Sequence, residues 1–339
     1  MSHALRPRSS ATWFTLSGRF GVAALLLAVG LTAGLPRTLH AQDGEKKVPA
    51  PVDVNLQTAD GVRLRATYFA STRGKESVPV VLLHEFKGSR HDMAALATSL
   101  QKNHGFAVVT VDLRGHGDST EVVDMDKKLD CNSPTFTPQF PRMVKYDLEA
   151  VKTFLFEKND AGELNVDKLC VVGAEMGASV GFLWSIVDWS WPQLTTNKQG
   201  QDVKGIVMIS PEPAFKTLRM TAITPDCIPD VLLQKASPQS IQQADNDVRS
   251  KVSIYVVVGA RDSSAVGAAN RVYTTFTKFR KPPAKKEDRD LFFDNSPDTK
   301  LQGSKLLQEK SLGVEDNIVA FIQARCADQV LPWSQRKTQ

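Results

Sequence analysis

A glutamate stands where the surrounding sequence favours a catalytic serine, in the stretch VVGAEMGASVG at residues 171–181. An apolar run enters a Gly-x-x-x-Gly turn, and small residues follow the turn. This pattern is typical of a nucleophile elbow, G-x-S-x-G, where a strand turns sharply into a helix and raises one side chain above the sheet. The raised side chain here is Glu175, and a carboxylate can attack an electrophile, accept a proton or bind a ligand.

The partners that a nucleophile needs are only partly present. Serine-type catalysis requires a histidine that takes the proton and an acid that orients the histidine. An acid, Asp262, ends the apolar run VVVGARD at residues 256–262. Behind such an elbow the chain order is nucleophile, acid, histidine, yet no histidine follows His116. The usual base is therefore missing from the part of the chain where it belongs.

A second register of the elbow motif begins at Gly177, because residues 177–181 also spell G-x-S-x-G, with Ser179 in the centre. That register would require the strand to continue as far as Met176. The apolar strand residues stop at Val172 instead. We therefore interpret Ser179 as a small residue that packs a helix against the sheet.

The elements that must position these residues alternate between strand and helix after an opening hairpin. Continuous Val- and Ile-rich runs predict strands that are buried on both faces, and their alternation with helices predicts a mostly parallel sheet. The expected fold class is α/β, a three-layer α/β/α sandwich with a sheet of about eight strands. Strands are predicted at residues 54–57, 61–69, 78–84, 106–112, 168–173, 204–210, 251–262 and 289–294. Helices are predicted at residues 92–103, 144–158, 176–189, 268–279 and 314–326.

The chain divides into a leader and one predicted domain. Residues 1–41 carry a basic start, an apolar run of 14 residues and a small residue, Ala41, at a plausible cleavage point. The apolar run is shorter than the ~20 residues of a membrane-spanning helix, so we predict a signal peptide and a secreted or periplasmic protein. An uncleaved anchor is the alternative. A linker at residues 42–53 precedes the single domain at residues 54–326, which contains a lid-like insertion at 211–249 and is followed by a tail at 327–339.

The basic balance of the chain belongs to its leader. The whole sequence has 42 basic and 37 acidic residues, and the leader holds four arginines and no acid. The remaining 38 basic and 37 acidic residues nearly cancel, which gives no indication of a nucleic-acid surface. We expect no transmembrane helix in the mature chain.

Four cysteines are spaced in a way that matches no zinc pattern, and no cofactor motif is present. Cys170 lies in an apolar strand and is expected to be a buried thiol. Cys131 and Cys227 both follow predicted strands, so a disulfide between them is one arrangement that export would permit. We expect neither a metal nor a cofactor.

Several motifs line up in an order that resembles the α/β-hydrolase superfamily. LLHEFKGSRHDM at 82–93 resembles its His-Gly-Phe-x-Gly-Ser stretch, and VDLRGHGDS at 111–119 is similar to its Asp-x-Arg-Gly-His-Gly-x-Ser loop. GAEMGAS at 173–179 resembles Gly-x-Ser-Met-Gly-Gly, and KLQGSKLL at 300–307 resembles His-Gly-x-x-Leu-Leu. The resemblance covers nearly the whole predicted domain and is greatest to small esterases, lysophospholipases and dienelactone hydrolases.

The resemblance implies that the triad positions are Glu175, Asp262 and Gln302, so that both the serine and the histidine are replaced. It also implies that the backbone N–H groups of Phe86 and Met176 form the oxyanion hole. His84 is expected to pack beneath the oxyanion turn. Glu85 stands where the family has glycine and brings a second carboxylate into the pocket.

Two hypotheses about function remain open from the sequence. In the first, Gln302 joins Glu175 and Asp262 as a static bridge, and the protein binds a small molecule or an unidentified protein partner without turnover. An acidic pocket floor would favour a cationic ligand. In the second, the protein is an esterase-like hydrolase that uses Glu175 as a carboxylate nucleophile or base. The absent histidine distinguishes them, since binding does not need it and turnover normally does.

Overall fold

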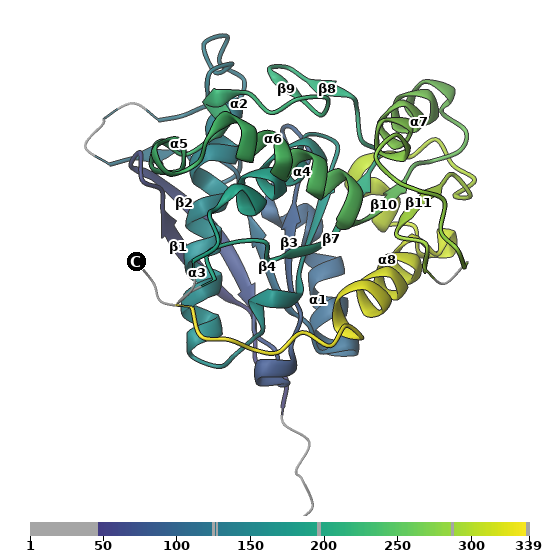
Figure 1. Ribbon diagram of the computed structural model, residues 1–339, viewed down its shortest axis with the longest axis horizontal. Helices are drawn as coiled ribbons and strands as arrows, with labels where there is room; N and C mark the ends of the chain where they lie inside the picture. The colour runs from purple at the N-terminus through teal and green to yellow at the C-terminus, as the bar shows by residue number, and fades with distance from the viewer. Residues whose placement is uncertain (1–46, 124–125, 127, 195–197, 286–287, 337–339) are drawn as a thin grey trace, which may run out of the picture. The chain divides into compact units, whose positions relative to one another are not determined.

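The computed structural model describes residues 47–336 except 124–125, 127, 195–197 and 286–287 (Figure 1). The predicted signal peptide and the first residues of the predicted linker lie outside the described residues.

A mixed sheet forms the centre of the described chain, in the strand order β1-β2-β4-β3-β6-β7-β10-β11, with β5 paired to β2. The pairs from β4 to β11 are parallel, whereas β1, β2 and β5 join by antiparallel pairs. The predicted α/β class with a mostly parallel sheet is confirmed. The strands are β1 (Val52–Gln57), β2 (Val62–Phe69), β3 (Pro79–Leu83), β4 (Ala107–Val111), β5 (Glu121–Val122), β6 (Leu169–Ala174), β7 (Val203–Ile209), β10 (Ser253–Val257) and β11 (Leu291–Asp294).

Helices cover both faces of this sheet, as the layers of Figure 1 show. Every residue of β3 and β4 is buried, because each face of these strands packs against apolar side chains. One core cluster takes buried residues from α3 (Leu148–Asp160), α4 (Met176–Ser190), α6 (Pro238–Lys251) and α7 (Ser263–Thr277). The other cluster takes them from α1 (Ala94–His104) and α8 (Val314–Ile322).

The insertion predicted at residues 211–249 has two parts with different packing. Its first part is a hairpin of β8 (Ala214–Phe215) and β9 (Leu218–Arg219), followed by the short helix α5 (Asp230–Lys235). Its second part is α6, which packs against α4 and contributes to the core. The first part also contributes buried residues to this core, among them Leu218 and Leu232. The remaining short helix, α2 (Gln139–Arg142), precedes a π-helical turn that leads into α3.

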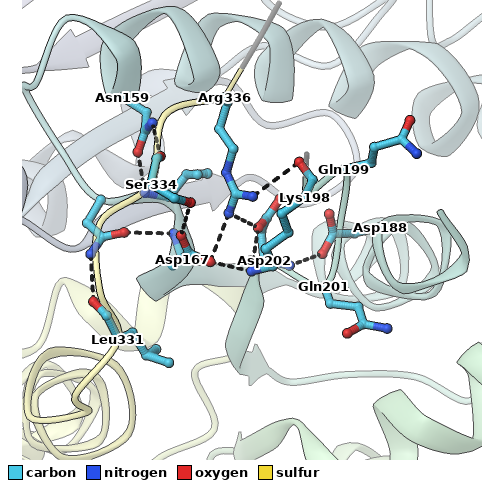
Figure 2. A network of polar contacts seen from close by, with 12 residues as sticks. Asn159, Asp167, Asp188, Lys198, Gln199, Gln201, Asp202, Leu331, Ser334 and Arg336 are labelled. Carbon is cyan, nitrogen blue, oxygen red and sulfur yellow. Dashed lines mark hydrogen bonds and ion pairs between the residues drawn. The ribbon is translucent and has the colours of Figure 1, made fainter. Parts of the chain in front are cut away.

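The C-terminal tail is fastened to the amino ends of the central strands (Figure 2). The Arg336 guanidinium is 1% exposed and donates to Asp202 just before β7, and it forms a 2.8 Å ion pair with Asp167 just before β6. The side chain of Asn159 donates to the carbonyl of Ser334 at 2.9 Å. The residues that the sequence predicts only as a tail thus complete a buried polar network.

All four cysteines are described and buried, and none forms a disulfide. The Cys131–Cys227 pairing is therefore wrong for this structure. Burial raises the pKa of the Cys227 thiol, as it does for Cys170 in β6. No helix in the described chain has the length and apolarity required to cross a membrane.

Candidate functional site

The elbow lies between β6, which ends at Ala174, and α4, which begins at Met176. Glu175 is the single residue between them. Its φ of 45° and ψ of −106° form a backbone conformation that non-glycine residues rarely adopt. The two glycines of the motif explain how so sharp a turn fits. A Cβ on Gly173 would overlap the backbone of Gly177, and a Cβ on Gly177 would lie 2.5 Å from the Leu83 carbonyl oxygen.

Ser179 does not occupy the elbow. It lies in the first turns of α4, fully buried, and its Oγ is without a hydrogen-bond partner in the described structure. A hydroxyl in that position has no access to a substrate. The structure therefore agrees with the interpretation of Ser179 as a small packing residue.

The Glu175 carboxylate lies next to the backbone of Gly303. A Cβ on Gly303, which has φ 59°, would be 3.0 Å from Glu175 Oε1, so the glycine makes room for the carboxylate. Burial raises the pKa of Glu175, and the negative charges of Glu85 and Glu212 raise it further, while Lys305 opposes the shift. Among the described residues the carboxylate has no hydrogen-bond donor. The site thus favours the protonated form of Glu175 more than water does.

Gln302 and Asp262 have partners other than Glu175. Ser210 Oγ donates to Gln302 Oε1 at 2.6 Å, and Gln302 Nε2 donates to the Gly259 carbonyl at 3.3 Å. Asp262 accepts from the N–H groups of Ser264 and Ala265 at 3.0 Å each and so caps α7. The predicted bridge of Gln302 between Glu175 and Asp262 is wrong, because Gln302 bonds to Ser210 and Gly259, and Asp262 caps α7.

The oxyanion turn, which follows β3 and carries the predicted oxyanion-hole N–H of Phe86, is held in place by His84. The Leu113 N–H donates to His84 Nε2 at 3.1 Å, so Nδ1 carries the proton and donates to the Glu85 carbonyl at 2.6 Å. Burial lowers the pKa of His84, which agrees with a neutral ring that uses both nitrogens. His84 therefore supports the turn that positions Phe86 and is not available as a base.

Glu85, the second carboxylate of the site, is held by Ser304, which was not among the predicted site residues. Ser304 Oγ donates to Glu85 Oε1 at 2.5 Å. Glu85 Oε2 is buried and has no partner in the described part of the chain. A buried acceptor without a donor is unfavourable by about 1–3 kcal/mol.

An open cleft of about 570 Å³ lies beside the elbow. Glu175 and Gln302 both line it, as do Phe86 and Leu301. Most of its other lining is charged and of both signs, from Glu85, Asp92, Lys87, Lys300 and Lys305. In the described residues no group of three or more His, Cys, Asp or Glu side chains could hold a metal ion.

No family model and no curated protein sequence matches the chain. The complex of DcsB with its substrate analogue has a TM-score of 0.52 and 15% identity, over 82% of this chain and 100% of that one. The Pyrococcus furiosus esterase Pf2001 has a TM-score of 0.51 and 17% identity, over 82% and 93%. The α/β hydrolase GrgF from Penicillium sp. sh18 has a TM-score of 0.50 and 12% identity, over 82% and 100%. The chain has the α/β-hydrolase fold.

Within this α/β-hydrolase fold, the loop after β4 serves the architecture. Asp112 accepts from the Arg90 backbone N–H at 2.5 Å and forms an ion pair with the Arg90 side chain. Arg114 is fully buried and donates to Asp147 at 2.8 Å and to Asp60 at 2.7 Å. The motif that most resembles the superfamily in sequence therefore holds loops and helices together, and its described contacts do not involve the elbow.

Aromatic side chains fill the apolar side of the site. Phe215 of β8 lies 5.4 Å from Phe86 and 5.4 Å from Phe140, measured between ring centroids, and Phe86 lies 5.9 Å from Phe140. The hairpin of the insertion thus occupies space next to the oxyanion turn. The space left open beside Glu175 is the polar cleft.

Sequence reasoning missed two serines of the site. Ser210 follows β7 with φ 50° and links Gln302 to the Gly303 N–H, which donates to Ser210 Oγ at 3.0 Å. Ser304 secures Glu85. The only local signal for Ser210 is its position at the end of a buried strand, where parallel strands place their functional side chains.

Proposed function

We propose that this protein binds a small polar ligand in the cleft beside Glu175 and does not hydrolyse it. One observation carries the proposal. The elbow keeps its strained backbone, but the position of the catalytic base holds Gln302, and that amide is engaged by Ser210 and Gly259. A geometry that is retained without its base favours recognition over turnover.

The chemistry of the site gives further support. If Glu175 attacked an ester, the resulting acyl-enzyme would need a base to activate water. An amide such as that of Gln302 cannot act as that base, and His84 uses both of its ring nitrogens. Glu85 and Glu175 would also repel the oxyanion that forms beside Phe86 and Met176.

Our proposal includes export of the mature chain to a secreted or periplasmic location. Its support is the basic and apolar leader at residues 1–41. Mass spectrometry of the protein recovered outside the cytoplasm tests it. The expected mass is that of a chain that begins at residue 42. A membrane-bound chain that keeps its leader would contradict the proposed export.

Ester hydrolysis by the purified chain of residues 42–339 tests the central proposal. Aryl esters with short and medium acyl chains are expected to react no faster than in buffer. The Glu175→Gln variant and the control Asp226→Asn, an exposed acid outside the cleft, are expected to be equally inactive. Turnover by the wild-type protein that is kept in Asp226→Asn and lost in Glu175→Gln would show a working carboxylate and overturn the proposal.

The Glu175→Ser variant separates the two replaced positions. It restores the hydroxyl on the existing elbow, and we expect it to stay inactive because Gln302 cannot take the proton. Turnover by Glu175→Ser alone would locate the loss of activity in Glu175 and leave the rest of the site competent.

A further inference from the structure

Charges of opposite sign line the cleft without pairing to each other. The carboxylates of Glu85 and Glu175 come from the oxyanion turn and the elbow. Lys300 and Lys305 come from the loop after β11 and the turn Gly303–Leu307, and both are exposed. No ion pair within 4.0 Å joins these lysines to any acid in the described chain. We call the two carboxylates the negative side of the cleft and the two lysines its positive side; Asp92 and Lys87 also line the cleft.

Lys305 acts electrostatically on Glu175 without forming an ion pair with it. The positive charge of Lys305 holds the pKa of Glu175 down, against the effects of burial and of the neighbouring acids. No ion pair within 4.0 Å joins the two groups. A molecule that lies between them can satisfy both charges at once.

The two acids of the negative side receive one described hydrogen bond, from Ser304 Oγ to Glu85 Oε1. Glu175 has no donor among the described residues, and Glu85 Oε2 is buried and unpaired next to its bonded Oε1. An ammonium group has three N–H donors and no acceptor. It is the ligand group that best matches the Glu175 carboxylate, which accepts no hydrogen bond in the described chain, beside the charge of Glu85.

The apolar side of the site is closed and the open side is small. Phe215 packs on Phe86 and Phe140, so aromatic side chains occupy the space next to Phe86. A volume of about 570 Å³ lies within the range of small-molecule pockets. These features favour a compact, polar ligand over a long acyl chain.

We propose that the ligand is a small zwitterion of the amino-acid or short-peptide class. Its ammonium group binds Glu175, where the negative charge of Glu85 adds to the attraction, and its carboxylate binds Lys300 and Lys305. This inference rests on the proposed binding function and names the ligand class for the same cleft.

Binding of a matched set of probes to the purified protein tests the inference. The set consists of alanine, dialanine and trialanine, each in free, N-acetylated and C-amidated form, measured by calorimetry and by thermal shift. The zwitterion of the fitting length is expected to bind about tenfold more tightly than either capped form, since each capping removes one charged contact. The three lengths cover the unknown distance between the two sides.

Variants assign the two ends of the ligand. Lys305→Gln is expected to weaken the free peptide to the level of its amide and to leave the amide unchanged. Glu175→Gln is expected to weaken the free peptide to the level of its N-acetylated form. Lys310→Gln is the matched control, because Lys310 is exposed on the following turn and does not line the cleft.

Each alternative result is informative. An amide that binds as tightly as the free peptide would exclude the lysines, and an N-acetylated peptide that does so would exclude the carboxylates. Absence of binding for all nine probes would overturn the ligand class. The proposed function fails separately, through turnover in the ester assay or through cleavage of dialanine or trialanine seen by mass spectrometry.

Discussion

The strained elbow makes a quantitative prediction about Glu175. Its φ of 45° and ψ of −106° lie in a region that is unfavourable for a residue with a side chain by about 1–3 kcal/mol. Glycine adopts positive φ without this penalty, but loses about 0.5–1 kcal/mol through the greater freedom of the unfolded chain. Glu175→Gly is therefore expected to be more stable than Glu175→Ala by about 1 kcal/mol. Both variants remove the carboxylate, so their difference isolates the backbone.

The free energy of unfolding of both variants can be measured with urea, by tryptophan fluorescence and circular dichroism. Their difference should not change with pH, because neither variant has an ionisable group at position 175. Equal m-values would show that both variants expose the same surface on unfolding, so that the shift in midpoint reports a difference in stability. If Glu175→Gly were no more stable than Glu175→Ala, the elbow would not be strained and the reasoning would be refuted.

The charge of Glu175 has an effect that the same measurements separate. The folded state raises the pKa of Glu175, through burial first and then through Glu85 and Glu212. The ionised carboxylate therefore destabilises the fold, and this loss develops as pH rises from the unfolded pKa, about 4.3, through the folded pKa. Glu175→Gln is expected to be more stable than the wild-type protein near pH 8. Its advantage should decline towards pH 4, and a constant or inverted difference would contradict the raised pKa.

Three further substitutions test the fold around the site. Gly177→Ala should destabilise the protein by about 2 kcal/mol or more, because its Cβ would lie 2.5 Å from the Leu83 carbonyl oxygen; thermal unfolding measures this. Arg336→Ala should destabilise it by about 3 kcal/mol, because buried Asp202 and Asp167 lose a partner, whereas the exposed control Arg271→Ala should change the unfolding free energy by less than about 0.5 kcal/mol. Ser179→Ala should leave ligand binding unchanged and raise stability slightly, since its hydroxyl is buried without a partner; a loss of binding would return Ser179 to the site.

The strands and the elbow could be predicted because their signals are local. Valine-rich runs such as that of β4 are buried on both faces, and burial on both faces requires apolar residues throughout. The glycine spacing around Glu175 reflects direct contact between Gly173 and Gly177. The role of Asp262 also has a local signal, because an acid followed by two serines is typical of a helix N-cap. The helix predicted at 268–279 begins at Ser263 in the structure, because Asp262 caps it there.

The partners of side chains could not be predicted where they come from distant segments. Gln302 could have bonded to either acid, and only the fold brings Ser210 and Gly259 to its amide. Export permits a disulfide between Cys131 and Cys227, yet a pairing depends on the positions of two loops that no periodicity defines. Arg336 is a charged residue in a polar tail, and nothing in its neighbourhood indicates that it becomes buried.

The attachment of Arg336 has a consequence for the order in which the chain folds during synthesis. Its partner Asp202 precedes it by 134 residues, and β11 and α8 are both complete before residue 336 is made. When α8 has just left the ribosome, the nascent chain already contains the strands of the sheet. At that stage Lys198 is the only described cation that forms an ion pair with Asp202 and Asp167. The acidic pair is fully neutralised only when residue 336 leaves the ribosomal tunnel. The amino ends of β6 and β7 therefore reach their full stability only after a segment that follows the last helix has been made, and a chain still tethered at α8 lacks this contribution.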